Sequence, residues 1–220
     1  MWRPIRSKSR CPDDDDFRLE GAHGCALLLS ICGGKLPSSR SREEPIITAE
    51  EFWLTQTRTP LLELVRGQPV PMRFCGGVHG GVKARVGTLL YEWADDSRGA
   101  VGISSGFVLA RDPDTVRGPD VWFVRAERMR SSGVPEGFWE GAPDLAVEVV
   151  DFQNTELEML GRVQDWLEGG TLLLWVVYPE REQIKVYGAD GLVRTLEKGD
   201  TLESEAILPG FRCRVSEVFE

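Results

Sequence analysis

The sequence has little of the chemistry from which structural zinc sites are made. Its 220 residues include only two histidines, and its five cysteines are scattered without a Cys-X-X-Cys pair. Structural zinc sites need four Cys or His ligands, usually in closely spaced pairs, so the composition argues against one. Scattered cysteines in an odd number instead indicate reduced thiols, and therefore a cytoplasmic protein.

Long apolar runs and an excess of basic charge are also missing. The apolar run CALLLSIC, at residues 25–32, is too short to span a bilayer. It follows the acidic segment CPDDDDFRLE, where a signal peptide would carry basic residues, so we expect no membrane association. The formal net charge of −9 argues against a protein that coats nucleic acid passively. It leaves room for a local basic groove.

The first 45 residues differ in composition from the rest of the chain. They are rich in Arg, Ser, Asp, Pro and Gly and show no hydrophobic periodicity. Such composition predicts a poorly ordered extension over residues 1–45, followed by one domain over residues 46–220. Upstream sequence included by a misassigned start codon is an alternative origin for the extension.

Hydrophobic periodicity after residue 46 predicts an α/β domain built around a mixed sheet. Thr48, with Glu51 three residues later, is the expected N-cap of the first helix. Helices are expected at 47–53, 78–96 and 154–170, the last capped by Asn154 with Leu157, Leu160, Val163 and Leu167 facing inward. Strands are expected at 61–72 (a pair around a Gly turn), 100–112, 119–129, 142–153 and 171–179 (central in the sheet), and in a hairpin at 182–200 with an Asp190-Gly191 turn.

One predicted strand, APDLAVEVVDFQ at residues 142–153, carries a carboxylate inside an apolar run. Glu148 shares a strand face with Asp144, but the two lie about 13 Å apart at ~3.3 Å per residue. A Mg²⁺ ion, whose ligand bonds are about 2.1 Å long, cannot bridge them. A metal at Glu148 would therefore need an acid from another strand, and Asp120, at the head of the preceding strand, is the candidate. Two alternatives stay open: Asp120 only makes a turn, and Glu148 pairs with an arginine.

Several motifs agree with one known family in their order and spacing. They are ITAEEFW with LLELVRGQPV, RDPDTVRGPDVWFV, EGAPDLAVEVV, RVQDWLEGGTLLLWVVYPE and ILPGF. The chain resembles the Uma family, a large bacterial group of putative restriction endonucleases within the PD-(D/E)XK nuclease superfamily. The resemblance covers roughly residue 46 to the C-terminus. It implies a restriction-endonuclease-like mixed sheet flanked by helices, with a C-terminal β-hairpin.

The resemblance also implies an activity and a set of site residues. The activity is Mg²⁺-dependent (or Mn²⁺-dependent) hydrolysis of phosphodiester bonds in DNA. Asp120 and Glu148 would be the metal-binding acids, together with the backbone carbonyl of Val149. Glu63 matches an early glutamate of the family, and His79 falls where members often carry histidine. The simpler alternatives are a salt bridge from Glu63 to a core arginine, and a surface or capping position for His79.

Two departures from the family pattern bear on activity. The superfamily lysine is supplied in this family from the helix after the second acid, and the corresponding position here is Arg162. A guanidinium can stabilise a phosphate transition state but does not give up a proton, so it cannot serve as a general base. The family's usual Ser-Pro-Ser is replaced by Asp-Phe-Gln at residues 151–153. These changes keep open a second function, a nuclease-fold protein without catalysis that acts as a binding or interaction module. A homodimer also stays open.

Overall fold

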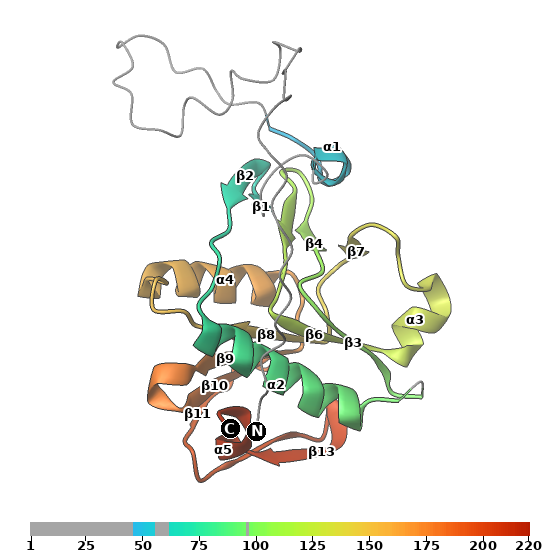
Figure 1. Ribbon diagram of the computed structural model, residues 1–220. Coiled ribbons are helices and arrows are strands. Elements are labelled where there is room, and N and C mark those ends of the chain that lie inside the picture. Colours follow the sequence, from blue (N-terminus) through green and yellow to red (C-terminus); the bar gives the residue numbers. More distant parts are fainter. Residues whose placement is uncertain (1–45, 56–61, 96) are drawn as a thin grey trace, which may run out of the picture. The chain divides into compact units, whose positions relative to one another are not determined.

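A mixed six-stranded sheet forms the centre of the fold (Figure 1). The computed structural model describes residues 46–55, 62–95 and 97–220, so the predicted extension over residues 1–45 lies outside the described residues. The strand order is β11-β10-β9-β8-β6-β3, in which only β8 and β9 are parallel neighbours. The strands are β3 (Gly99–Ile103), β6 (Val121–Arg125), β8 (Leu145–Val149), β9 (Leu173–Tyr178), β10 (Gln183–Gly188) and β11 (Val193–Leu196). The predicted α/β class, the central position of the strand near 171–179 and the Asp190-Gly191 hairpin are confirmed.

Two helices cover opposite faces of this sheet. Helix α2 (Gly77–Trp93) packs on one face and α4 (Glu156–Glu168) on the other (Figure 1). Strand β8 is buried on both sides, and its successive side chains alternate between the two faces. Leu145, Val147 and Val149 join the core with α2, whereas Ala146 joins the core with α4. Glu148 shares the face of Ala146 and therefore projects towards α4.

A second, five-stranded sheet extends the domain on the side of α1 (Ala49–Thr55), with strand order β2-β1-β5-β4-β7. Its strands are β1 (Leu62–Val65), β2 (Gln68–Pro71), β4 (Phe107–Ala110), β5 (Thr115–Arg117) and β7 (Trp139–Glu140). The predicted turn between β1 and β2 is present, with Arg66 and Gly67 at φ 51° and 75°, the left-handed pair that tight hairpins need. The predicted strand at 100–112 is instead two strands, β3 and β4, one in each sheet. Ser104, at φ 52°, lies in the break between them.

One further predicted boundary is wrong. The strand at 119–129 ends at Arg125, and helix α3 (Ala126–Ser132) follows. The short helix η1 (Pro179–Arg181) directly follows β9. The chain ends with a hairpin of β12 (Thr201–Ser204) and β13 (Leu208–Arg214), and with α5 (Val215–Val218).

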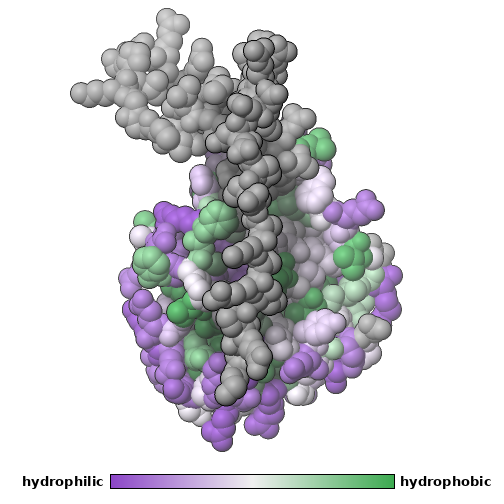
Figure 2. Space-filling view, in the orientation of Figure 1, coloured by the Kyte–Doolittle hydropathy of each residue, from purple (hydrophilic) through white to green (hydrophobic). Residues whose placement is uncertain are grey.

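Hydrophilic residues gather along the lower rim of the face seen in Figure 2. Within the described ranges, no helix is both long and apolar enough to cross a membrane.

Helix α4 differs from its prediction in cap and in buried face. Its N-cap is Thr155 rather than Asn154, and a capping box joins Thr155 to Glu158. Leu157 and Leu160 are 80% and 61% exposed, so their predicted inward orientation is wrong. The buried stripe is Met159, Val163 and Trp166, which has the same helical spacing. Periodicity alone could not choose between these two stripes.

The first helix is held to the second sheet by a buried carboxylate. The predicted capping box is present, since Thr48 and Glu51 exchange hydrogen bonds of 2.9 and 3.2 Å. In addition, the amide of Ala49 and the guanidinium of Arg111 each donate to Asp114 at 2.8 Å. Asp114 is only 8% exposed. Burial opposes its ionisation, but these donors and the amide of Asp112 together lower the pKa of Asp114.

We predict that Asp114→Asn lowers the free energy of unfolding by about 2 kcal/mol near pH 7, because a charge-assisted set of hydrogen bonds is lost. The folded pKa is below the unfolded value of about 3.9, so this contribution is present above that value and disappears as pH falls through the folded pKa. Urea unfolding at several pH values measures it. Glu50→Gln removes an exposed partner of the same arginine and should change stability little. Equal losses for the two variants would contradict the role of Asp114.

Candidate active site

The two acids singled out by the sequence meet at the edge where β6 and β8 pair. Asp120 directly precedes β6, whose Val121 lies opposite Val147 of β8. The amide of Asp120 donates to the carbonyl of Val147 at 2.9 Å, and the amide of Val149 donates to Asp120 Oδ2 at 2.8 Å. Asp120 is therefore clamped beside the stretch of β8 that carries Glu148. The two carboxylates are close enough for the charge of Asp120 to raise the pKa of Glu148.

Glu148 is buried and receives two donors from α4. Its Oε1 accepts from Arg162 Nη2 at 2.8 Å and from Trp166 Nε1 at 2.6 Å. Burial raises the pKa of Glu148, the positive charge of Arg162 opposes that rise, and the charge of Asp120 adds to it. A carboxylate in the middle of a core strand is thus explained by a partner that reaches it from the covering helix. This contact is the pairing of Glu148 with an arginine that the sequence left open. It does not exclude a metal ion at Glu148.

Arg162 joins Glu148 to the second sheet. Its Nη1 donates to Glu63 Oε2 at 2.6 Å, and its Nη2 also donates to the carbonyl of Gly118 at 3.2 Å. Glu63 additionally accepts from Arg117 Nη1 at 2.7 Å and from the amide of Gly118 at 3.0 Å. Burial works against ionisation of Glu63, but Arg162 and Arg117 outweigh it and lower its pKa. The ion pair of Glu63 with an arginine, which was the alternative to a role in the site, is therefore present, and it lies next to the candidate site.

Helix α2 brings two side chains, His79 and Lys83, to Asp120. His79 Nε2 lies 3.3 Å from Asp120 Oδ2, and Lys83 Nζ lies 3.1 Å from Asp120 Oδ1. Lys83 also donates to Ser104 Oγ at 2.6 Å. His79 is buried, so it is not a surface residue as the alternative supposed. Burial lowers the pKa of His79, but its hydrogen bond to Asp120 and the charge of Asp120 raise it more.

Sequence reasoning missed Lys83, although a signal was available. It stands four residues after His79, on the same face of α2, where an i,i+4 pair points to one target.

All five predicted site side chains, Asp120, Glu148, Arg162, Glu63 and His79, come together around this corner. Asp144 lies outside it, as predicted, because its carboxylate is taken by Arg125, with contacts of 2.7 Å to Nε and 2.9 Å to the amide.

The donor set suits a magnesium-type ion better than zinc. Among the residues that the structure describes, no group of three or more His, Cys, Asp and Glu side chains could hold a metal. Mg²⁺, however, commonly uses one or two carboxylates and completes its shell with water and substrate phosphate. The contacts found for Glu148 go to Oε1, so Oε2 would be the oxygen that binds a cation. Two adjacent acids of this kind therefore fit Mg²⁺ or Mn²⁺.

Comparisons with known proteins show the family of this α/β protein. The sequence model of the Uma2 family, described as "Putative restriction endonuclease", matches residues 49–216, so the chain belongs to this family. A crystal structure of a putative nuclease belonging to DUF820, from Anabaena variabilis ATCC 29413, is similar with a TM-score of 0.68. The similarity covers 79% of this chain and 97% of that one, at 16% sequence identity. No curated protein matches this chain.

We predict that Arg162→Met lowers the free energy of unfolding by about 3–5 kcal/mol at neutral pH, because it leaves two buried carboxylates without their shared cation. Arg162→Lys keeps the charge but not the two-armed bridge, so its loss should be smaller. Chemical denaturation of the three proteins measures both effects.

The unfolding free energy lost in Arg162→Met should depend on pH, and the direction of this dependence follows from the pKa of Glu148. Without Arg162, the folded pKa of Glu148 rises further above the unfolded value of about 4.3, so the folded state binds more protons than the unfolded state. Its stability then rises as pH falls through that window. The stability lost in Arg162→Met should therefore become smaller as pH falls from neutral towards the unfolded pKa of Glu148. A deficit that is constant with pH would mean that Glu148 does not depend on Arg162.

Proposed function

We propose that this protein is a metal-dependent nuclease that hydrolyses phosphodiester bonds in DNA. The observation that carries the proposal is the corner where Asp120 and Glu148 lie together, with Lys83 and Arg162 beside them. Two adjacent acids with cations at hand form the arrangement needed to bind a divalent ion and an anionic substrate at once. Family membership and the nuclease-like fold support the same reaction class.

Each residue of the corner has a distinct role in this proposal. Asp120, Glu148 and the carbonyl of Val149 would hold Mg²⁺ or Mn²⁺, which would acidify a water molecule and offset charge on the phosphate. Arg162 is a positioning residue, because its guanidinium is engaged by Glu63 and Glu148 and so fixes the second acid. His79, from α2, holds Asp120 through its Oδ2.

Lys83 takes the place of the missing family lysine. Its ammonium is at Asp120, yet its side chain is 20% exposed, so a phosphate arriving at the metal could meet it. An ammonium donates up to three hydrogen bonds, and Asp120 and Ser104 use two of them. The third is available to a phosphate oxygen or to the attacking water. Lys83 would thus supply from α2 the charge stabilisation that other members supply from the helix after the second acid.

The second candidate function is a binding module without catalysis. It is favoured by the arginine at position 162, which is consumed in ion pairs, and by the altered segment at 151–153. In the structure this segment is tied to the start of α2, since the amide of Gly76 donates to Asp151 at 3.2 Å and Arg73 donates to the carbonyl of Gln153 at 3.1 Å. Cleavage assays separate the two functions.

Metal binding should appear as stabilisation. A cation between Asp120 and Glu148 relieves their mutual repulsion, and an ion that binds only the folded state stabilises it by mass action. We expect the thermal unfolding temperature to rise with Mn²⁺ or Mg²⁺ in the wild type and to stay constant in Asp120→Asn. An equal rise in both proteins would place the ion elsewhere.

Cleavage should depend on Lys83. In the presence of Mn²⁺ we expect the wild type to cut plasmid or single-stranded DNA, Asp120→Asn to be inactive, and Lys83→Met to be slower by about a hundredfold, the usual effect of removing one transition-state donor. The matched control is Lys198→Met, which removes an exposed lysine paired with Glu182 and should leave the rate unchanged. If the wild type cuts no DNA although it binds the ion, the binding-module function replaces this one.

A further inference from the structure

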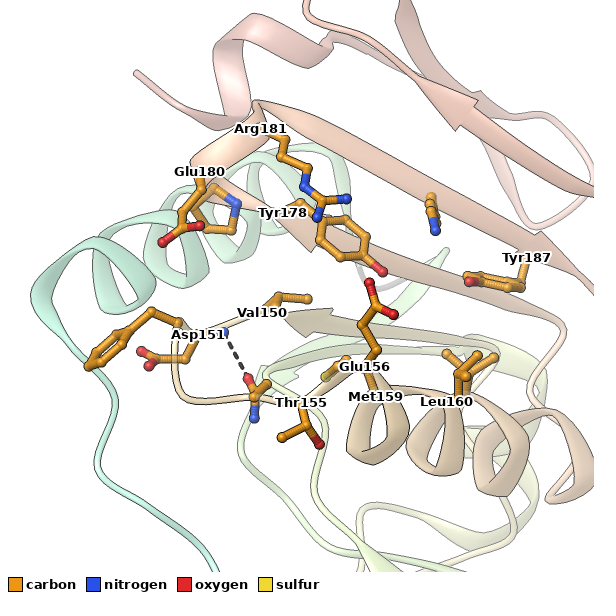
Figure 3. Close-up of a pocket in the computed structure, with 15 residues that line it drawn as sticks. Val150, Asp151, Thr155, Glu156, Met159, Leu160, Tyr178, Glu180, Arg181 and Tyr187 are labelled. Atoms are coloured by element: carbon orange, nitrogen blue, oxygen red, sulfur yellow. Dashed lines mark hydrogen bonds between the residues drawn. The ribbon is translucent and has the colours of Figure 1, made fainter.

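A pocket of about 300 Å³ lies between α4 and the β9–β10 pair (Figure 3). This is at the small end of the range for ligand pockets. The apolar residues that line it include Val150, Met159 and Val163. Leu160 contributes an exposed apolar side chain from the same face of α4. The pocket therefore offers both apolar and polar side chains to a small ligand.

Two tyrosines on neighbouring strands give the pocket its aromatic walls. Tyr178 ends β9 and Tyr187 lies on β10, and both rings border the cavity in Figure 3. Neither hydroxyl makes a hydrogen bond to another residue that the structure describes, so both can serve a ligand. Figure 3 also shows the carboxylate of Glu156 turned towards these rings. Burial raises the pKa of Tyr178. The electrostatic effects of Tyr187 and Glu156 raise this pKa further, and the charge of Arg181 opposes the rise.

The charges around the pocket favour a neutral ligand over a small anion. Three acids line it, Asp151, Glu156 and Glu180, against two bases, Arg181 and Lys185. Both bases are already placed on the ring of Tyr178, at 5.7 and 5.4 Å from its centroid. A free phosphate would therefore meet more negative than positive charge. A flat ring with an amino group fits better, because the ring packs between apolar and aromatic surfaces and a carboxylate accepts from the amino group.

The pocket begins where the candidate active site ends. Val150 and Asp151, which line it, directly follow Glu148 and Val149 on the same segment of chain. Since Glu148 and the pocket both lie on the α4 side of the sheet, a strand with its phosphate at the acids can place a nearby base at the pocket. A base inside a duplex is stacked and paired, and it cannot enter a pocket of this kind until it is extruded.

From these observations we infer that the pocket receives an unpaired nucleobase of the nucleic acid strand that is cut. The inference rests on the proposed nuclease function, and it narrows the substrate class to single-stranded or locally opened nucleic acid. An amino-bearing base, such as cytosine or adenine, is the expected occupant because of Glu156.

The test is a binding measurement without cleavage. Fluorescence anisotropy of a labelled single-stranded oligonucleotide is recorded in EDTA, where a metal-dependent nuclease does not cut. Replacing Tyr178 and Tyr187 together by alanine should weaken binding by about tenfold or more, the effect of losing base stacking. Tyr91→Ala, which removes an exposed tyrosine from α2, should bind like the wild type. A labelled duplex of the same sequence should bind more weakly than the single strand.

A second pair of variants guards against a folding defect. Leu160 and Leu157 are both exposed on α4, but only Leu160 lines the pocket. Leu160→Glu and Leu157→Glu change the net charge equally, so general electrostatic repulsion is matched. Only Leu160→Glu should weaken single-strand binding, by about tenfold.

Other outcomes overturn the inference. Equal binding by Leu160→Glu, Leu157→Glu and wild type would show that the pocket holds no part of the strand. A mononucleotide that displaces the oligonucleotide at the same concentration would make this a free-nucleotide pocket instead. Because no cleavage is needed, an inactive protein that still shows the pocket-dependent binding would refute the nuclease function and leave the pocket assignment standing.

Discussion

The structure depends on one largely buried guanidinium. Arg162 lies between Glu63 of the second sheet and Glu148 of the central sheet, with contacts of 2.6 and 2.8 Å. Each carboxylate alone would be costly to bury, and so would the arginine. Together they hold two sheets and helix α4 in one geometry, and they fix the carboxylate of Glu148 beside Asp120. The same contact thus explains how a charged residue is tolerated in a core strand and why the candidate metal site is in place before any ion arrives.

Much of this arrangement could be predicted from the sequence, because it follows from local rules. The alternation along β8, the capping box at Thr48 and the Asp190-Gly191 turn each depend on a few neighbouring residues. The predictions that were wrong concern features that depend on the rest of the fold. Two apolar stripes on α4 have equivalent spacing, and only packing against the sheet selects Met159 over Leu160. The break that sends β3 and β4 into different sheets is likewise set by tertiary partners.

The candidate site shows the same division. Its acids could be found in the sequence because each sits in a motif, and the resemblance to the family placed Glu63, His79 and Arg162 around them. Lys83 was not predicted as a site residue because its partners, Asp120 and Ser104, are distant in sequence. They come together only when α2 packs on the sheet. The pocket beside the site was not predicted for a similar reason. Tyr178 and Tyr187 lie on different strands and face α4 only in the folded chain.

The central claim is that Asp120 and Glu148 bind one catalytic cation. Anomalous diffraction from crystals soaked in Mn²⁺ tests it most directly, because manganese is located by its own signal. The account predicts a peak within bonding distance of both carboxylates, about 2.1–2.2 Å, and no such peak in crystals of Asp120→Asn. A wild-type peak elsewhere, or none at a Mn²⁺ concentration that supports cleavage, would contradict it.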